Sequence, residues 1–190
     1  MGDFMDFFDL HCDTLTECMD DGDSLLKNER DIDFERGKIF GRWNQVFAVF
    51  IPDSMDDSLV ESYFDSACDF YLSELKKKGD VFPILSSEDV RGHSRGVMLA
   101  MESSRGVGSL ERLEKLYERG LRLITLTWNH KNRAAGGCDE GGGLTDWGRE
   151  LVSKMEKLGI VTDVSHLSDR SFYDLCEFSD APFIARHSDA

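Results

Sequence analysis

The sequence is poor in basic residues and has no long apolar run. Among its 190 residues, Lys and Arg total 22 against 37 Asp and Glu, which gives a formal charge of -15. This deficit of positive charge disfavours nucleic acids, anionic membranes and other polyanions as partners, and it is compatible with cation binding. No run approaches the roughly 18 apolar residues of a membrane-spanning helix, and residues 1–6 are acidic where a secretory signal is basic. We therefore expect a soluble, cytoplasmic protein.

The sequence also lacks the motifs of several common cofactor and redox sites. Its five cysteines are scattered and odd in number, with no Cys-x-x-Cys spacing, so we expect reduced thiols. No Gly-x-Gly-x-x-Gly turn follows the first apolar run, which argues against a dinucleotide-binding fold. The glycine-rich segment 136–143 contains acidic residues and no lysine or hydroxyl in the Walker position. We interpret it as a flexible loop and not as a phosphate-binding loop.

Short apolar runs alternate along the chain with amphipathic segments. The runs are too short for helices, and most are apolar on both faces, as parallel strands buried between two layers are. We predict strands at 7–10, 46–51, 97–101, 121–126, 160–164 and 183–185. Helices are predicted at about 59–78, 110–119, 145–158 and 169–181. For the first helix, Ser58 and Glu61 form a predicted capping box and Gly79 is the predicted end.

Alternating strands and helices are the signature of βαβ units with right-handed crossovers. The pattern suits an open doubly wound sheet or a (β/α)8 barrel. The barrel is favoured because the dinucleotide turn is absent and because polar residues follow the carboxyl ends of several strands, where barrel enzymes place their catalytic groups. We therefore predict an α/β fold, a TIM barrel of the metal-dependent hydrolase type with about six of its eight β/α units, over residues 1–190 as a single, incomplete domain.

Three histidines and two carboxylates follow these predicted strand ends. His11 and Asp13 come after the first strand, and because side chains at i and i+2 share a face, both project to the same side. Glu102 follows the third predicted strand, His166 the fifth and His187 the sixth. The carboxyl ends of parallel strands meet at one rim of a barrel, so we expect these five residues to converge there.

Imidazole and carboxylate ligands together suit Zn, Mn, Fe or Co, and five of them exceed what one tetrahedral zinc requires. The simplest arrangement is two metal ions that share Glu102 as a bridging ligand. Two cations about 3.5 to 4 Å apart hold a water between them and lower its pKa toward 7, which produces a hydroxide nucleophile. The sequence thus predicts hydrolytic chemistry. His130 follows the fourth strand, reaches the same rim and is a candidate for substrate contact.

Several segments also carry a family pattern. They are residues 9–15 (DLHCDTL), 123–129 (LITLTWN), 143–145 with 148–152 (GLT, GRELV), 158–168 (LGIVTDVSHLS) and 181–188 (APFIARHS). Together they resemble the membrane (renal) dipeptidase family of zinc metallopeptidases over essentially the whole chain. The resemblance implies a barrel with two zinc ions that hydrolyses dipeptides. It places His11, Asp13 and Glu102 on one zinc and Glu102, His166 and His187 on the other. The catalytic candidates are Glu102, as the shared ligand, and His130, because of its place after the fourth predicted strand.

The chain departs from the family pattern in three places. Trp128 stands where several members have a histidine that polarises the substrate carbonyl, and His130 lies two residues later. Arg186 precedes His187 where the family usually has serine, and strand alternation turns this cation away from the metals. The family continues past the position of Ala190 with two more strands, an arginine for the substrate carboxylate and a proton-handling aspartate. We therefore expect the chain to be a fragment of a longer protein.

Two other functions stay open at this point. One is a different binuclear barrel hydrolase that acts on phosphoesters, lactones or acylated amino acids. The other is a metal-binding remnant without catalysis. The sequence leaves open the preferred dipeptide, the metal used in the cell and whether the protein forms a homodimer.

Overall fold

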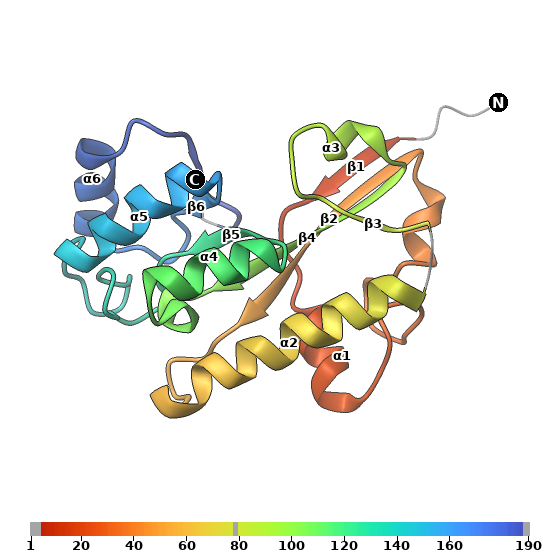
Figure 1. Ribbon diagram of the computed structural model, residues 1–190, viewed down its shortest axis with the longest axis horizontal. Helices are drawn as coiled ribbons and strands as arrows, with labels where there is room; N and C mark the ends of the chain where they lie inside the picture. Colours follow the sequence, from red (N-terminus) through yellow and green to blue (C-terminus); the bar gives the residue numbers. More distant parts are fainter. Residues whose placement is uncertain (1–4, 78–79, 188–190) are drawn as a thin grey trace. The chain divides into compact units, whose positions relative to one another are not determined.

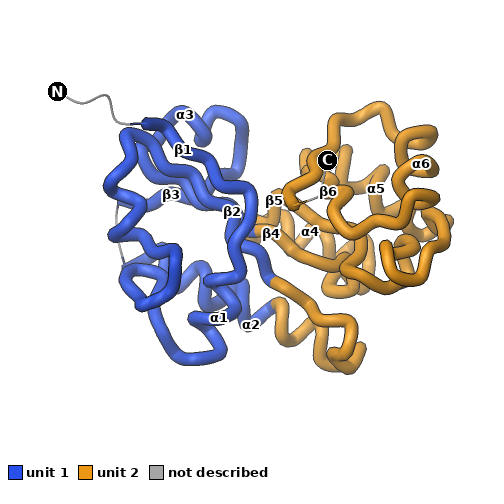
Figure 2. Tube along the Cα trace, turned by 180° about the vertical axis from the view of Figure 1, so that it is seen from behind, with its two compact units in different colours: residues 1–49, 65–99 blue, residues 50–64, 100–190 orange. Residues whose placement is uncertain are grey.

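The computed structural model describes residues 5–77 and 80–187 (Figure 1). The chain divides into two compact units. Unit 1 comprises residues 1–49 and 65–99, and unit 2 comprises residues 50–64 and 100–190 (Figure 2). Two strands and one long helix begin in one unit and end in the other, so the chain passes between the units along regular elements.

Unit 1 contains parallel strands joined through helices. Phe34 packs edge-on against the rings of Trp43 and Phe47, and all three are buried, so aromatic rings form much of its core. β1 pairs with β2, and β3 with β4, both in parallel. The elements are β1 (Asp6–Asp9), α1 (Thr14–Asp21), η1 (Arg36–Ile39), β2 (Arg42–Phe50), most of α2 (Asp57–Lys77), β3 (Phe82–Pro83), α3 (Asp89–Gly92) and the start of β4 (Arg95–Glu102).

A buried carboxylate connects α2 to the loop after α1. The Glu74 side chain is 0% exposed. It accepts hydrogen bonds from the Ser24 hydroxyl (2.5 Å) and the Leu25 backbone N–H (3.0 Å), and it forms an ion pair with Lys77. Each partner offsets part of the free energy that burial of the charge costs.

Unit 2 repeats the alternation of strand and helix. Its further elements are η2 (Ser104–Val107), α4 (Leu110–Glu118), β5 (Leu121–Thr125), α5 (Asp146–Leu158), β6 (Val161–Asp163), α6 (Asp169–Phe178) and β7 (Phe183–Ile184). Strands β5, β6 and β7 are parallel neighbours in that order. Helix α4 packs against β5 and α5, and α5 packs against β6 (Figure 1).

Helices α4, α5 and α6 begin where the sequence provides a cap. Ser109, Thr145 and Ser168 each accept a hydrogen bond from the backbone N–H three residues later. Gly159 ends α5 in the left-handed conformation, with φ 77°, which glycine adopts without strain. Because these helices return the chain to the start of the next strand, the carboxyl ends of β5, β6 and β7 all open at one edge of the sheet.

The predicted fold class is confirmed, since parallel strands alternate with helices. Each predicted strand is present, as β1, β2, β4, β5, β6 and β7, with ends shifted by a few residues. The structure adds elements that were not predicted, namely α1, β3, α3 and the two 3-10 helices.

The predicted start of α2 is wrong. The helix begins at Asp57, because Asp56 Oδ1 accepts the Ser58 backbone N–H (2.9 Å) and the Ser58 hydroxyl (2.6 Å). Asp56 therefore performs the capping that the prediction gave to Ser58. The predicted end at Gly79 lies outside the described residues.

β1 is more exposed than a strand buried between two layers. Phe7 and Phe8 are each 38% exposed, because β2 is the one strand that pairs with β1 in the described part of the chain. The Phe7 ring stacks on Phe40 with 4.8 Å between centroids. The N-terminal strand is thus an edge strand.

Among the described residues, no helix combines the length and the apolar character that a membrane crossing needs. The cytoplasmic location and the single domain over residues 1–190 stay predictions.

Candidate metal centre

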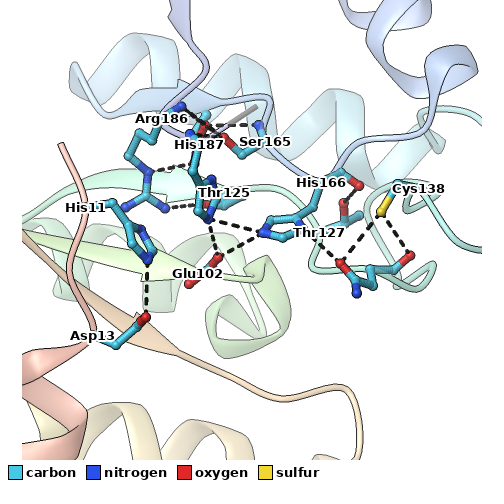
Figure 3. Close-up of polar contacts among 12 residues, drawn as sticks. His11, Asp13, Glu102, Thr125, Thr127, Cys138, Ser165, His166, Arg186 and His187 are labelled. Atoms are coloured by element: carbon cyan, nitrogen blue, oxygen red, sulfur yellow. Dashed lines mark hydrogen bonds and ion pairs between the residues drawn. The ribbon is translucent and has the colours of Figure 1, made fainter. Parts of the chain in front are cut away.

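Glu102, His166 and His187 converge in unit 2 (Figure 3). Glu102 ends β4, His166 lies in the loop after β6, and His187 follows β7. Nε2 of His166 is 3.1 Å from Glu102 Oε1, Nε2 of His187 is 3.0 Å from the same oxygen, and the two Nε2 atoms are 3.2 Å apart. Three predicted ligand atoms therefore meet at one point.

The spacing of these atoms suits a divalent cation. Two imidazole nitrogens bound to a tetrahedral zinc at about 2.0–2.1 Å lie about 3.3 Å apart. The observed separation of the two Nε2 atoms is 3.2 Å. The Glu102 side chain is only 3% exposed, whereas the His166 and His187 side chains are 21% and 30% exposed, so solvent reaches the histidine side of the cluster. Nitrogen and carboxylate oxygen together form a donor set for zinc and its neighbours in the first transition row.

Asn129 orients the His166 ring. Its Oδ1 lies 2.9 Å from His166 Nδ1. An Nδ1–H that donates to this oxygen leaves the lone pair of Nε2 directed at Glu102 and His187, which is the orientation that metal binding needs. Sequence reasoning missed this role, because Asn129 is 37 residues away from His166 in the chain.

The backbone of His166 is left-handed, with φ 66°, a conformation that few residues other than glycine adopt. Its carbonyl oxygen accepts hydrogen bonds from the Thr127 hydroxyl (3.2 Å) and the Cys138 backbone N–H (2.9 Å). These bonds hold the histidine in place from the loop after β5 and from the glycine-rich segment.

The glycine-rich segment 136–143 has a packed start and exposed residues at 138–140, and its flexibility stays a prediction. Gly136 and Gly137 are buried. A Cβ atom on Gly136 would lie 2.1 Å from the Gly141 carbonyl oxygen, and one on Gly137 would lie 2.4 Å from the Asn129 carbonyl oxygen. Only glycine permits these backbone approaches. The segment therefore supports Asn129 and His166.

A buried ion pair joins the strand ends of unit 2. The side chains of Arg186 (labelled in Figure 3) and Asp163 are both 0% exposed, with 2.7 Å between Arg186 Nε and Asp163 Oδ2. Arg186 Nη2 also donates to the Thr125 hydroxyl at 2.5 Å. Burial alone raises the pKa of Asp163, but the Arg186 charge and the hydrogen bonds from Thr125 and Ser165 outweigh it and hold this pKa below its ordinary value. The cation next to His187 is thus neutralised by a carboxylate.

His11 and Asp13 lie in unit 1, just after β1. His11 Nε2 is 3.4 Å from Asp13 Oδ2, so both side chains project to the same side, as the sequence predicts. Between them, Cys12 extends the pairing with β2, since its N–H donates to the Val46 carbonyl (3.1 Å) and its carbonyl accepts the Ala48 N–H (2.9 Å). Asp13 Oδ1 is buried and has no hydrogen-bond partner among the described residues, which fits a ligand atom.

His130 lines a pocket of unit 2. Its Nδ1 is 2.8 Å from Asp53 Oδ2, and its backbone N–H donates to the same oxygen at 3.0 Å. The hydrogen bond between the imidazole ring and the Asp53 carboxylate raises the pKa of His130 above its ordinary value. The pocket has a volume of about 780 Å³ and is lined mainly by charged residues, namely Asp53, Asp57, Glu61, Arg105, His130, Lys131 and Arg133, with Ser54, Gly108 and Asn132.

Trp128 packs between Phe50 and His166. Its ring centroid is 5.0 Å from that of Phe50 and 6.2 Å from that of His166. Both Trp128 and Phe50 are half-buried. An aromatic wall therefore borders His166, at the position where several members of the resembled family carry a histidine.

A parallel α/β fold with carboxylate and imidazole side chains at its strand ends has the arrangement in which barrel enzymes place their catalytic groups. A family model described as membrane dipeptidase (peptidase family M19) matches residues 3–190. The chain belongs to this family, as the resemblance in its sequence predicted.

Curated relatives match part of the chain. An uncharacterised protein of Acinetobacter calcoaceticus, from the PQQ-III 3' region, is 29% identical over 113 residues, which are 54% of this chain and 36% of that protein. An uncharacterised dipeptidase of Schizosaccharomyces pombe is 39% identical over 88 residues, 43% of this chain and 21% of that one. The aligned segments thus span less than half the length of these relatives.

Solved structures share the fold. Dipeptidase AC, a metallopeptidase of family M19, has a TM-score of 0.85 at 22% identity, over 97% of this chain and 63% of that chain. A metallopeptidase from Rhodobacter sphaeroides, solved with a phosphinate mimic of the dipeptide L-Ala-D-Ala, has a TM-score of 0.83 at 21% identity, over 98% and 66%. The predicted fold, part of a (β/α)8 barrel, is confirmed.

Proposed function

We propose that the protein is a metallodipeptidase that hydrolyses the peptide bond of dipeptides with two zinc ions. Membership of the membrane dipeptidase family supports this function. The observation that carries it is the convergence of Glu102 Oε1 with the Nε2 atoms of His166 and His187, at 3.0 to 3.2 Å from one another.

Five residues are proposed as ligands. His11 and Asp13 would hold one ion, His166 and His187 would hold the other, and Glu102 would contact both, since a carboxylate offers two oxygens. When bound, the two ions lower the pKa of a shared water toward 7 and polarise the peptide carbonyl. The first set is supported by the buried Oδ1 of Asp13, which has no hydrogen-bond partner within residues 5–77 and 80–187.

Residues of the chain prepare the ligands and the substrate for this chemistry. Asn129 fixes the His166 ring so that Nε2 faces the cluster. His130 is the proposed substrate contact, because Asp53 binds its Nδ1 and leaves Nε2 as the ring nitrogen on the other side. The hydrogen bond with Asp53 also favours the protonated imidazolium, which can donate to a carbonyl or carboxylate oxygen of the dipeptide.

The test begins with protein freed of metal by a chelator and reloaded with Zn²⁺. Elemental analysis is expected to give about two zinc ions per chain. A panel of dipeptides, with L-Ala-L-Ala and L-Ala-D-Ala among them, is then assayed by chromatography of the released amino acids. Hydrolysis is expected with the reloaded protein and none with the chelated protein.

A pair of histidine variants provides the control. His166→Ala is expected to lose one zinc ion and the activity, whereas His93→Ala, which removes a histidine stacked on Phe82, is expected to keep both. Activity on phosphoesters, lactones or acylated amino acids without dipeptide hydrolysis would identify a different barrel hydrolase. Bound zinc with no hydrolysis of any of these would identify a metal-binding protein without catalysis.

A further inference from the structure

We propose that Arg186 and Asp163 are positioning residues that jointly set the geometry of the two metal-binding histidines, His166 and His187. The proposal rests on the proposed function, because it assumes that these histidines bind metal. It assigns a role to two side chains that are themselves 0% exposed.

The Asp163 carboxylate links three segments of unit 2. Its Oδ1 accepts the Ser165 backbone N–H (3.0 Å) and the Ser165 hydroxyl (2.8 Å). Its Oδ2 accepts the Thr125 hydroxyl (2.6 Å) and Arg186 Nε (2.7 Å). One carboxylate therefore fixes the end of β5, the residue before His166 and the residue before His187 relative to one another.

The Ser165 hydroxyl completes the connection. It donates to Asp163, and it accepts the backbone N–H groups of Arg186 (2.9 Å) and His187 (3.3 Å). A hydroxyl has one proton and two lone pairs, so Ser165 uses its full capacity in these bonds. The backbone of one histidine segment is thus bonded directly to the side chain that precedes the other histidine.

This connection matters because His166 occupies an unfavourable backbone conformation. Its φ of 66° persists only if the surrounding contacts hold it. If the contacts of Ser165 and Asp163 are weakened, the loop can relax toward an ordinary conformation and carry Nε2 away from Glu102. The metal site would then lose preorganisation while the fold stays intact.

The arginine side chain suits the surroundings of Asp163 in this chain. A buried Asp163 needs a compensating positive charge, and the planar guanidinium presents Nε to Asp163 and Nη2 to Thr125 at the same time. A lysine carries the charge on a single nitrogen and cannot reproduce both directions. The Arg186 side chain contacts Asp163 and Thr125 whereas His187 Nε2 contacts Glu102, so the two neighbouring side chains have different partners.

The experiment compares metal binding in two variants. Arg186→Lys keeps the charge and loses the planar fork. Arg186→Met alone would leave a buried carboxylate without a cation and could prevent folding, so the second variant is the neutral pair Asp163→Asn with Arg186→Met. We expect the dissociation constant for Co²⁺ to rise about 10- to 100-fold in both, as is typical when an outer partner of a metal ligand is removed. The visible spectrum of the Co²⁺-loaded protein is expected to change as well. Circular dichroism identifies a temperature at which each variant is fully folded, and Co²⁺ binding is compared at that temperature.

Arg112→Met is the matched control. Arg112 is also in unit 2, its side chain is 18% exposed, and it donates to the Gly106 carbonyl at 3.1 Å and pairs with Glu61. Its loss is expected to lower the melting temperature without a change in Co²⁺ affinity or spectrum. If the Arg186 variants also melt earlier but keep the wild-type Co²⁺ affinity and spectrum, the pair is purely structural and the proposal is overturned. If the wild-type protein binds neither Co²⁺ nor Zn²⁺, both the positioning role and the proposed function are wrong. Failure of the positioning role alone is therefore distinguishable, because the wild type then still binds metal.

Discussion

Two buried glutamates show how differently the two units use the same side chain. Glu74 in unit 1 is 0% exposed and Glu102 in unit 2 is 3% exposed. Glu74 is surrounded by hydrogen-bond donors, namely the Ser24 hydroxyl, the Leu25 N–H and the Lys77 ammonium. Glu102 faces two imidazole nitrogens, each of which can offer a lone pair.

The difference indicates that the kind of partner, and not burial, separates the structural carboxylate of Glu74 from Glu102, the proposed metal ligand. Donors already compensate the charge of Glu74, so the protein needs no further group there. A carboxylate and two imidazoles at 3.0 to 3.2 Å form a cluster that a shared cation stabilises. The same substitution should therefore have opposite consequences at the two positions.

The largest effect is expected for Glu102→Gln. The substitution keeps the shape and removes the charge that both proposed zinc sets share. Zinc affinity and dipeptide hydrolysis should fall by more than about 100-fold, because even outer partners of metal ligands are worth about 10- to 100-fold. Without metal, the free energy of unfolding should stay the same or increase, since a buried charge is removed. Isothermal titration with Zn²⁺ and urea denaturation measure the two quantities. Unchanged zinc affinity would contradict the assignment.

The second-largest effect is expected for substitutions of Asn129. Asn129→Ala removes the oxygen that accepts from His166 Nδ1 and should weaken zinc binding by about 10- to 100-fold. Asn129→Asp retains an acceptor and should bind zinc more tightly than the alanine variant. Zinc titrations of the three proteins test this order. Equal affinity of the alanine variant and the wild type would show that another contact orients the ring.

Glu74→Gln tests the other half of the comparison, namely the structural role of Glu74. The amide places an NH₂ group among donors, so the free energy of unfolding should fall by about 1 to 3 kcal/mol. Zinc affinity and dipeptide hydrolysis should be unchanged, because none of the partners of Glu74, namely Ser24, Leu25 and Lys77, is a proposed zinc ligand. Urea denaturation monitored by circular dichroism provides the measurement. A loss of zinc affinity in the folded variant would mean that the two glutamates are coupled.

The smallest effect is expected for the exposed pair of His130 and Asp53. The pKa of His130 is raised in the folded state by its hydrogen bond with Asp53, so the stabilisation is fully present below the unfolded value of about 6.5 and is lost as the pH rises through the folded pKa. The wild type should therefore lose slightly more stability than His130→Gln between about pH 6 and pH 8. Melting curves across this range give the comparison. If His130 contacts the dipeptide, His130→Gln also raises KM, whereas identical kinetics would exclude that role.

The sequence alone predicted the parts of the fold that have a local signal. Thr145 and Ser168 precede helical patterns, and Gly159 follows one, so both ends of α5 and the start of α6 were readable. The same holds for His11 and Asp13, whose shared side follows from strand geometry. The two-residue β3 is too short for a periodic pattern, and α1 contains mostly polar residues, so neither gave a signal.

The rest depends on contacts between residues that are distant in the chain. Asp163 was visible as part of a strand, but its partner Arg186 is 23 residues away, and nothing in a single sequence pairs them. The packing of Gly137 was not predicted for the same reason. The Asn129 carbonyl oxygen lies so close to it that a Cβ atom would not fit, and this approach is visible only in three dimensions.

The hydrogen bond from the Cys138 N–H to the His166 carbonyl gives the candidate metal centre a built-in reporter. Cys138 itself is exposed, so its amide can exchange with deuterated water whenever this one bond opens. The exchange rate of a single backbone proton therefore measures how often the His166 loop leaves its bound conformation. Zinc that holds His166 in place should slow this exchange, and the ratio of rates with and without metal would express the preorganisation of the site as a free energy.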